Sequence, residues 1–298
     1  MMREQMADAV PTDGWFNSKG PDAPIAWYGG KSLLAGWIID QFPQHRVYVE
    51  PYIGMANVLL KKVRSEVEVC NDLDGRVTNF FQVIRDPAGL AELKRLAELT
   101  PYSREAFGEL CDQIEPQGPI ERAYWFFVRC RQARGGIGMS AITKNAWATS
   151  TRTRRGMPEP ISKYLSAIDG LDKVADRFRH VIIEHQHAID VINKYDGPDV
   201  LIYCDPPYLA ETRNGGKAET YAAEMTTEDH KALLEALRAC KARVVLSGYP
   251  STLYDQSLEG WRRIERPMHV QLSNSGGMRT EVLWLNFPAQ EDAHVQSA

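Results

Sequence analysis

Residues 199–204 read DVLIYC, and the chain continues with the tetrapeptide from Asp205 to Tyr208, DPPY. After Asp199, the unbroken apolar run from Val200 to Cys204 is typical of a strand buried on both faces of a sheet. The two adjacent prolines can continue neither a strand nor a helix, so they fix the chain and leave its carbonyl oxygens without regular partners. The stretch therefore predicts a central strand whose carboxyl end directs hydrogen-bond acceptors into a cleft.

Other short apolar runs share this character and predict a layered α/β fold. They are bounded by turn residues and lie at 47–50, 67–70, 181–184 and 243–247. Residues 226–239 have helical spacing, and Thr226 is placed to cap that helix. Near the end of the chain, HVQLS and EVLWLNF flank the glycine-bearing turn NSGGMRT, which predicts an antiparallel hairpin. We expect a mostly parallel sheet that ends in this hairpin.

Residues 87–175 interrupt the alternation of strands and helices with helical, aromatic-rich and then Arg-, Thr- and Gly-rich sequence. This predicts a mainly helical module inserted between two parts of one domain, residues 23–86 and 176–298. Residues 1–22 lack the apolar run and cleavage site of a secretory signal, and we expect them to form a flexible tail.

The segment YVEPYIGMANVLL, residues 48–60, predicts a strand, a tight turn at Gly54 and a helix from about Asn57. Ligands of doubly wound sheets bind at such turns, where a glycine allows close approach of the backbone. Asp72, eighteen residues after Gly54, follows the next strand, where its carboxylate suits the two hydroxyls of a ribose. The spacing fits an adenosine-bearing cofactor, although ordinary strand-to-helix turns have the same form.

An earlier segment, WYGGKSLL at 27–34, ends like the phosphate loop of nucleotide hydrolases. Ile25 stands where that loop requires a glycine, which argues against phosphate binding. We expect Lys31 to reach a carboxylate and Trp27 to flank an apolar ring or methyl group. The alternative is a surface lysine beside a core tryptophan.

The five cysteines are widely spaced and form no CxxC pair, which indicates reduced thiols in a cytoplasm and neither zinc nor disulfides. The longest apolar stretches have strand length, so we expect no membrane span. The net charge of the chain is −4, but residues 119–165 hold nine Lys or Arg against two Glu. Such a basic segment indicates affinity for a polyanion or a solvated basic face.

The DPPY tetrapeptide suits an amino group attached to an aromatic ring, such as that of adenine. This amine is a poor nucleophile because its lone pair is delocalised. The carboxylate of Asp205 and the carbonyl of Pro206 are placed to accept its two hydrogens, and Tyr208 is placed to stack on the ring. This is a positioning mechanism that needs no covalent intermediate, so Cys204 has no chemical role in it.

These motifs together resemble the Dam-type, or alpha-group, adenine-N6 DNA methyltransferases. In order, the chain matches the family's W-x-G-G-K, E-P-F-x-G-x-G, acidic-turn, D-P-P-Y and S-x-N-G-G-x-R segments, at Trp27 to Lys31, Glu50 to Ala56, Asn71 and Asp72, Asp205 to Tyr208, and Ser273 to Arg279.

The resemblance implies an S-adenosylmethionine-dependent methyltransferase (Rossmann-like) fold and methylation of a flipped adenine in DNA, in a bacterial or phage-encoded enzyme. It implies that the methyl donor is held by Trp27, Lys31, Glu50, Tyr52, Gly54, Asp72 and Asp205, and that the catalytic residues are Asp205, Pro206 and Tyr208.

The chain departs from the family pattern at the cofactor turn, where Tyr52 replaces phenylalanine and Ala56 replaces the second glycine. The recognition region matches poorly, so no target sequence carries over and no partner restriction enzyme is indicated. With the family in view, we expect the basic segment to bind DNA. The expected DNA-binding residues are Arg131, Arg134, Arg152, Arg154 and Arg155.

Two other functions fit parts of the pattern. Protein methyltransferases that act on glutamine side-chain amides also use an [N/D]-P-P-Y turn, but that family places asparagine first and lacks the early G-G-K segment. A catalytically inactive DNA-binding relative is the second alternative, which Ala56 leaves open. RNA in place of DNA is a lesser one.

Overall fold

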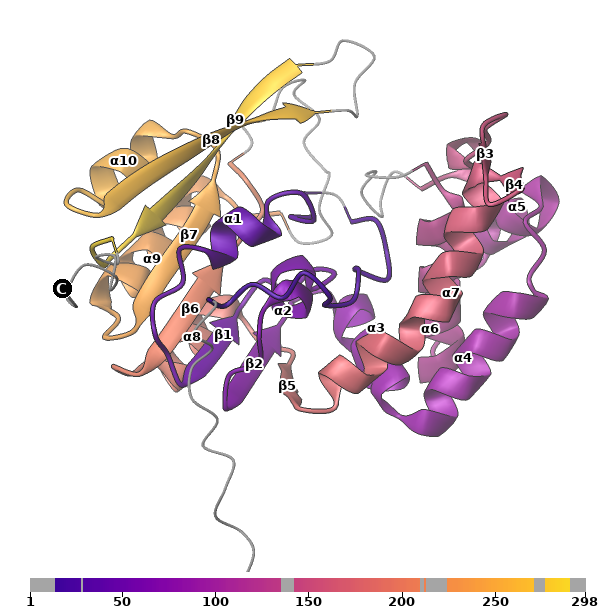
Figure 1. Cartoon of the computed structure of the whole chain (residues 1–298), viewed down its shortest axis with the longest axis horizontal. Helices are drawn as coiled ribbons and strands as arrows, with labels where there is room; N and C mark the ends of the chain where they lie inside the picture. Colours follow the sequence, from indigo (N-terminus) through magenta and orange to yellow (C-terminus); the bar gives the residue numbers. More distant parts are fainter. Residues whose placement is uncertain are drawn as a thin grey trace, which may run out of the picture.

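The computed structural model describes residues 14–27, 29–134, 142–209, 212, 224–270 and 277–289. Its centre is a seven-stranded sheet in the order β5-β2-β1-β6-β7-β9-β8 (Figure 1). The strands are β1 (Val47–Glu50), β2 (Val67–Asn71), β5 (Val181–Glu184), β6 (Val200–Cys204), β7 (Arg243–Gly248), β8 (Arg262–Val270) and β9 (Gly277–Leu285).

The pairings follow the expected pattern. Strands β5, β2, β1, β6 and β7 are parallel to one another, whereas β9 is antiparallel to both β7 and β8. The C-terminal hairpin is thus confirmed, but its first strand begins at Arg262, seven residues before the expected HVQLS segment. Residues 271–276 of its turn lie outside the described residues.

Alternation along the buried strands divides the core into two layers. Tyr48, Tyr203 and Val245 face one layer, while their neighbours Val49 and Ile202 face the other. Helices α8 (Ala188–Tyr195), α9 (Thr227–Ala239) and α10 (Thr252–Ser257) contribute to the second layer, whereas the short helices α1 (Ala35–Ile39) and α2 (Asn57–Lys61) pack in the first. Thr226 caps α9 in a reciprocal capping box, as its position in the sequence predicts.

A helical module lies beside the sheet, on the right in Figure 1. Its elements are α3 (Gly75–Arg85), α4 (Pro87–Leu99), α5 (Arg104–Asp112), α6 (Pro119–Gln132), a 3₁₀ turn (Lys144–Ala146), a small hairpin of β3 (Thr153–Arg154) and β4 (Met157–Pro158), and α7 (Glu159–Phe178). Helix α3 packs on α6 and α7, so it lies with the module although it precedes residue 87. The boundary drawn at residue 175 falls inside α7.

Residues 14–22 lie against the domain, whereas the sequence assigned them to a tail. Trp15 is buried and stacks on His45 at 4.0 Å between ring centroids. Gly20 passes so close to the α2 backbone that a Cβ there would lie 2.2 Å from the Leu60 carbonyl oxygen. Residues 1–13 lie outside the described part of the chain. No helix in the described part is long and apolar enough to cross a membrane.

Candidate active site

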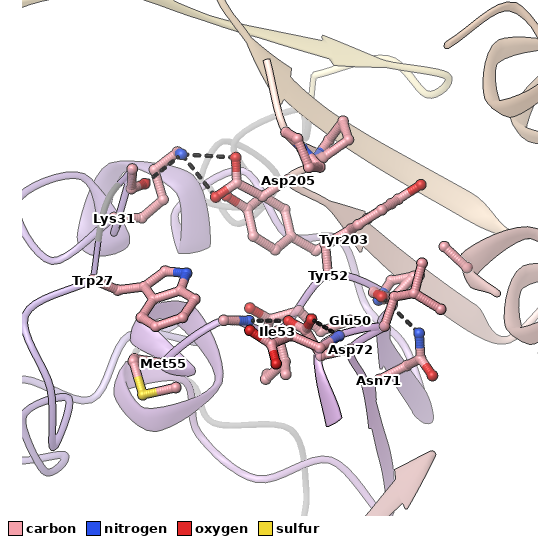
Figure 2. Close-up of a pocket in the computed structure, with 18 of the residues that line it drawn as sticks. Trp27, Lys31, Glu50, Tyr52, Ile53, Met55, Asn71, Asp72, Tyr203 and Asp205 are labelled. Atoms are coloured by element: carbon pink, nitrogen blue, oxygen red, sulfur yellow. Dashed lines mark hydrogen bonds and ion pairs between the residues drawn. The ribbon is translucent and has the colours of Figure 1, made fainter. Parts of the chain in front are cut away.

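A cavity of about 320 Å³ opens where the carboxyl ends of β1, β2 and β6 meet, as expected for ligand sites of open parallel sheets. Figure 2 shows its wall, with Trp27 and Lys31 on one side and Glu50 and Asp72 across from them. The expected cofactor residues all line it: Trp27, Lys31, Glu50, Tyr52, Gly54, Asp72 and Asp205. The fold therefore brings these separate segments to one place.

The turn after β1 has the conformation that its glycine predicts. Gly54 has a φ of 46°, and a Cβ there would meet the Trp27 ring at 3.0 Å. Both backbone conformation and close packing thus require glycine at this position. Ala56, where the family has its second glycine, also adopts positive φ, at 59°, and is fully buried. Its methyl group is accommodated at the cost of a left-handed backbone.

Asp72 holds this turn from the next strand. One of its carboxylate oxygens accepts the Gly54 amide and the other accepts the Asp74 amide, each at 2.9 Å. Desolvation by burial nevertheless raises the pKa of Asp72 to about 6. Its half-buried carboxylate lines the cavity and has lone pairs left for ligand hydroxyls.

Lys31 joins the first segment to the tetrapeptide. Its ammonium lies 2.7 Å from both carboxylate oxygens of Asp205, 174 residues away, and donates to the Gly29 carbonyl. Burial alone would lower the pKa of Lys31, but Asp205 and Glu281 raise it above its usual value. Asp205 also accepts a hydrogen bond from Ser247 on β7 at 2.9 Å. The expected lysine–carboxylate contact is thus present.

Tyr208 takes a different place from the one its expected stacking role suggests. It is only 5% exposed and is absent from the lining of the cavity, which Pro206 and Pro207 do reach. Its hydroxyl donates to Glu281 at 2.6 Å, and its ring packs against Tyr249 with centroids 4.4 Å apart. A base can stack on Tyr208 only if a face of this ring becomes uncovered.

Two further carboxyl groups at the site are buried. Burial raises the pKa of Glu50 to about 8, although Tyr48 donates a hydrogen bond to it. Burial and the nearby charge of Asp205 raise the pKa of Glu281 to about 7, while Lys31 opposes that shift. Glu50 lines the cavity whereas Glu281 does not, and each carboxyl group gives up its proton only when the pH rises through these values.

Ser247 and Glu281 are polar residues of the site that none of the sequence motifs indicated. Each lies on a strand whose inward-facing residues are otherwise apolar: Ser247 follows Val245, and Glu281 precedes Leu283 on the same face of β9. A polar residue at an inward position of such an alternation is the local signal that could have found them.

The expected DNA-binding arginines fall in two places. Arg152, Arg154 and Arg155 belong to the β3–β4 hairpin, and all three are exposed. Arg131 and Arg134 lie at the end of α6 and beyond it, where they donate to the carbonyls of Lys163 and Asn145. Arg131 is partly buried and ties α6 to α7, so its contacts within the module are structural. The aromatic run from Tyr124 to Phe127 packs in the module, with Trp125, Phe126 and Phe127 buried.

The chain is similar to known proteins at the level of a family. The family model described as D12 class N6 adenine-specific DNA methyltransferase matches residues 27–266. A search of curated proteins finds no match. Among solved structures, the chain is similar to the crystal structure of a proposed RNA methyltransferase from Pyrococcus horikoshii, with a TM-score of 0.34 and 8% identity over 85% of this chain and 79% of that chain. The family match spans the cavity, the helical module and the tetrapeptide.

Proposed function

This chain belongs to the D12 class of N6 adenine-specific DNA methyltransferases, and from that premise we propose that it transfers a methyl group from S-adenosylmethionine to the 6-amino group of a flipped adenine, in the manner of the Dam-type, alpha-group enzymes. The expected α/β methyltransferase fold and the expected activity, DNA adenine methylation, are confirmed. The observation that carries the proposed site is one cavity bordered both by Asp72 and by Asp205 with Pro206.

The residues around the cavity fit the methyl donor. Asp72 is placed to accept ribose hydroxyls, and Trp27 offers an aromatic wall. Asp205 supplies negative charge for a ligand that carries ammonium and sulfonium groups, whereas Glu50, whose pKa is raised to about 8 by burial, offers an uncharged carboxyl group at neutral pH. When bound, S-adenosylmethionine supplies an electrophilic methyl group. Within the described residues, no group of three or more metal-ligating side chains lies together.

The tetrapeptide residues prepare the amine. The Asp205 carboxylate and the Pro206 carbonyl accept the two amino hydrogens, which directs the nitrogen lone pair toward the methyl group. Lys31 and Ser247 fix the carboxylate in this orientation. Because an adenine stacked in a duplex cannot reach the cavity, the base is extruded from the helix at a cost of a few kcal/mol.

DNA contact is assigned to the helical module, residues 87–175 together with α3, and above all to the exposed arginines of the β3–β4 hairpin. In Figure 1 this hairpin lies at the upper end of the module, on the same side of the view as the outer end of the β8–β9 hairpin. Arginine side chains at such a place suit phosphates and guanine edges.

The activity is tested by single-molecule sequencing of DNA from a methylation-free bacterial host that expresses the chain. We expect N6-methyladenine in a fixed sequence context. Asp205→Ala should reduce methylation about a thousandfold, because the amine loses its anionic acceptor. Asp190→Ala, at an exposed aspartate of α8, is the matched control and should leave the pattern unchanged.

Full methylation by a folded Asp205→Ala variant would refute the proposed role of the tetrapeptide. If the folded wild-type protein binds S-adenosylmethionine but modifies no adenine in DNA, methylation of glutamine side-chain amides or of RNA becomes the favoured function.

A further inference from the structure

Glu281 is a buried carboxyl group to which the mechanism above gives no role. It lies on β9, is 2% exposed, and accepts the Tyr208 hydroxyl at 2.6 Å. The same oxygen lies 3.8 Å from the Lys31 ammonium. Burying a carboxyl group costs desolvation energy, and a packed apolar side chain would stabilise the fold as well. The contacts of Glu281 therefore point to a role other than stability.

Lys31 lies between two carboxyl groups. Its ammonium is 2.7 Å from Asp205 and 3.8 Å from Glu281, and it also lies 4.8 Å from the centroid of the Tyr208 ring. These residues come from three segments: the stretch before α1, the turn after β6, and β9. The Lys31 ammonium therefore contacts both Asp205, which accepts the amine, and Glu281, which holds the Tyr208 ring.

Two physical consequences follow from this arrangement. A carboxylate that fully neutralises a lysine is a weaker hydrogen-bond acceptor, so a second anion beside Lys31 strengthens Asp205 toward the amine. A base that stacks on Tyr208 must also displace a side chain that covers a face of the Tyr208 ring. The hydrogen bond to Glu281 keeps the ring itself in place during that exchange.

We propose that Glu281 is a positioning residue for methyl transfer, which anchors the Tyr208 ring beside Asp205 and shares the Lys31 ammonium with Asp205. The inference rests on the proposed roles of Asp205 and Tyr208. Glu281 acts through these residues and does not line the cavity.

The arrangement predicts a pH dependence. Among the charged and titratable groups around Glu281 are Lys31 before α1, Tyr203 on β6, Asp205 and Tyr208 after β6, Tyr249 after β7, the cross-strand residue Arg266 on β8, and Arg279 on β9, which donates to Tyr249. With its pKa raised to about 7, Glu281 gains a proton as the pH falls through neutrality and stops attracting Lys31. Lys31 then pairs more strongly with Asp205, so kcat should fall on the acid side of pH 7.

Two substitutions separate the two roles. Glu281→Gln retains an oxygen that accepts the Tyr208 hydroxyl but removes the charge, whereas Tyr208→Phe removes the hydrogen bond and retains the charge. We measure kcat and KM between pH 6 and 9 with the full chain, labelled S-adenosylmethionine and DNA from a methylation-free host. Each substitution should lower kcat at pH 8 about tenfold, with the KM for S-adenosylmethionine within about twofold. Only Glu281→Gln should abolish the step near pH 7.

The matched control is Glu184→Gln. Glu184 on β5 makes the same kinds of contact, accepting Tyr195 at 2.6 Å and Lys194 at 2.7 Å, but both partners lie on α8 and outside the cavity lining. Its substitution should leave kcat and the pH profile as in the wild type.

A wild-type pH profile and kcat in folded Glu281→Gln would overturn the inference. If that variant does not fold, wild-type kcat in Tyr208→Phe would overturn it instead. A parallel assay of Asp205→Ala distinguishes a failure of the proposed function from a failure of the inference about Glu281. Full activity there would contradict the proposed tetrapeptide chemistry, whereas a defect there beside a normal Glu281→Gln contradicts only the role of Glu281.

Discussion

At the scale of single residues, Asp72 combines two tasks that have opposite electrostatic demands. Its oxygens accept the amides of Gly54 and Asp74, which stabilise the carboxylate. Burial has the larger effect and raises the pKa to about 6. Because the folded state binds the proton more tightly than the unfolded state, this group's contribution to stability is greatest below its usual pKa and is lost as the pH rises through about 6.

Affinity for S-adenosylmethionine should show the reverse trend at this residue. Ribose hydroxyls donate to the ionised carboxylate, so protonation below about pH 6 opposes binding. We expect the dissociation constant, measured by isothermal titration calorimetry, to be about tenfold larger at pH 5 than at pH 7. Asp72→Asn should weaken binding and remove this dependence, whereas Asp190→Asn should not. Unchanged pH dependence in Asp72→Asn would disprove the assignment.

At the scale of elements, the β3–β4 hairpin presents three exposed arginines through its turn. Arg155 and Gly156 both have positive φ, at 54° and 75°, which is the backbone of a type I′ turn. Arg155 also donates to Ser166 on α7 at 3.0 Å, so the turn is fixed to the helix that follows it. The charges of Arg152 and Arg154 are thus held at a defined position rather than spread along a loose loop.

Removing these charges should weaken DNA binding. Substitution of Arg152, Arg154 and Arg155 with alanine should lower affinity and reduce the slope of log affinity against log salt by up to about 3, since each phosphate contact contributes about 0.9. Fluorescence anisotropy with duplex DNA at several salt concentrations measures both.

The matched control removes three exposed charges away from the hairpin: Arg95 and Lys173 on the module, and Arg179 just beyond α7. Arg179 follows the far end of α7, about 30 Å from the hairpin by helix length. An equal loss of affinity in both triple variants would indicate that the effect is one of net charge and not of the hairpin.

At the scale of the whole molecule, a buried ionic cluster joins the helical module to the sheet. Glu68 on β2 is 1% exposed and pairs with Arg177 of α7 and with Lys62, 3.0 Å away. Burial alone would raise the pKa of Glu68, but these two cations lower it below its usual value. Lys62 also lies over the ring of Trp15, so the cluster connects the module, the sheet and residues 14–22.

Glu68→Ala should therefore destabilise the protein strongly. It leaves two cations with little solvent and no anion, and we expect the free energy of unfolding to fall by about 3–5 kcal/mol in urea titrations. Glu66→Ala is the matched control, because Glu66 is 73% exposed and lies 4.0 Å from Arg46 at the surface. That change should stay within about 0.5 kcal/mol. A loss below about 1 kcal/mol in Glu68→Ala would contradict the proposed link.

The sequence by itself determined the features that have a local or periodic cause. Apolar runs of strand length predicted the parallel sheet, and the glycine-bearing turn predicted its C-terminal hairpin. The turn at Gly54 and the Asp72 carboxylate were found because a glycine and an acidic residue each followed a strand, and the carboxyl ends of parallel strands share one edge.

Only the tertiary structure decided which side chains meet. Lys31 and Asp205 are 174 residues apart, and Tyr208 and Glu281 are 73 apart. No local pattern identifies these partners, because their contact depends on how the strands of the sheet and the segment before α1 come together. Three further features could not be read from local sequence. Tyr208 is buried, its hydroxyl donates to Glu281, and Glu68 joins the module to the sheet. Burial also decides the ionisation of these carboxyl groups, since desolvation arises only once the surrounding chain has folded.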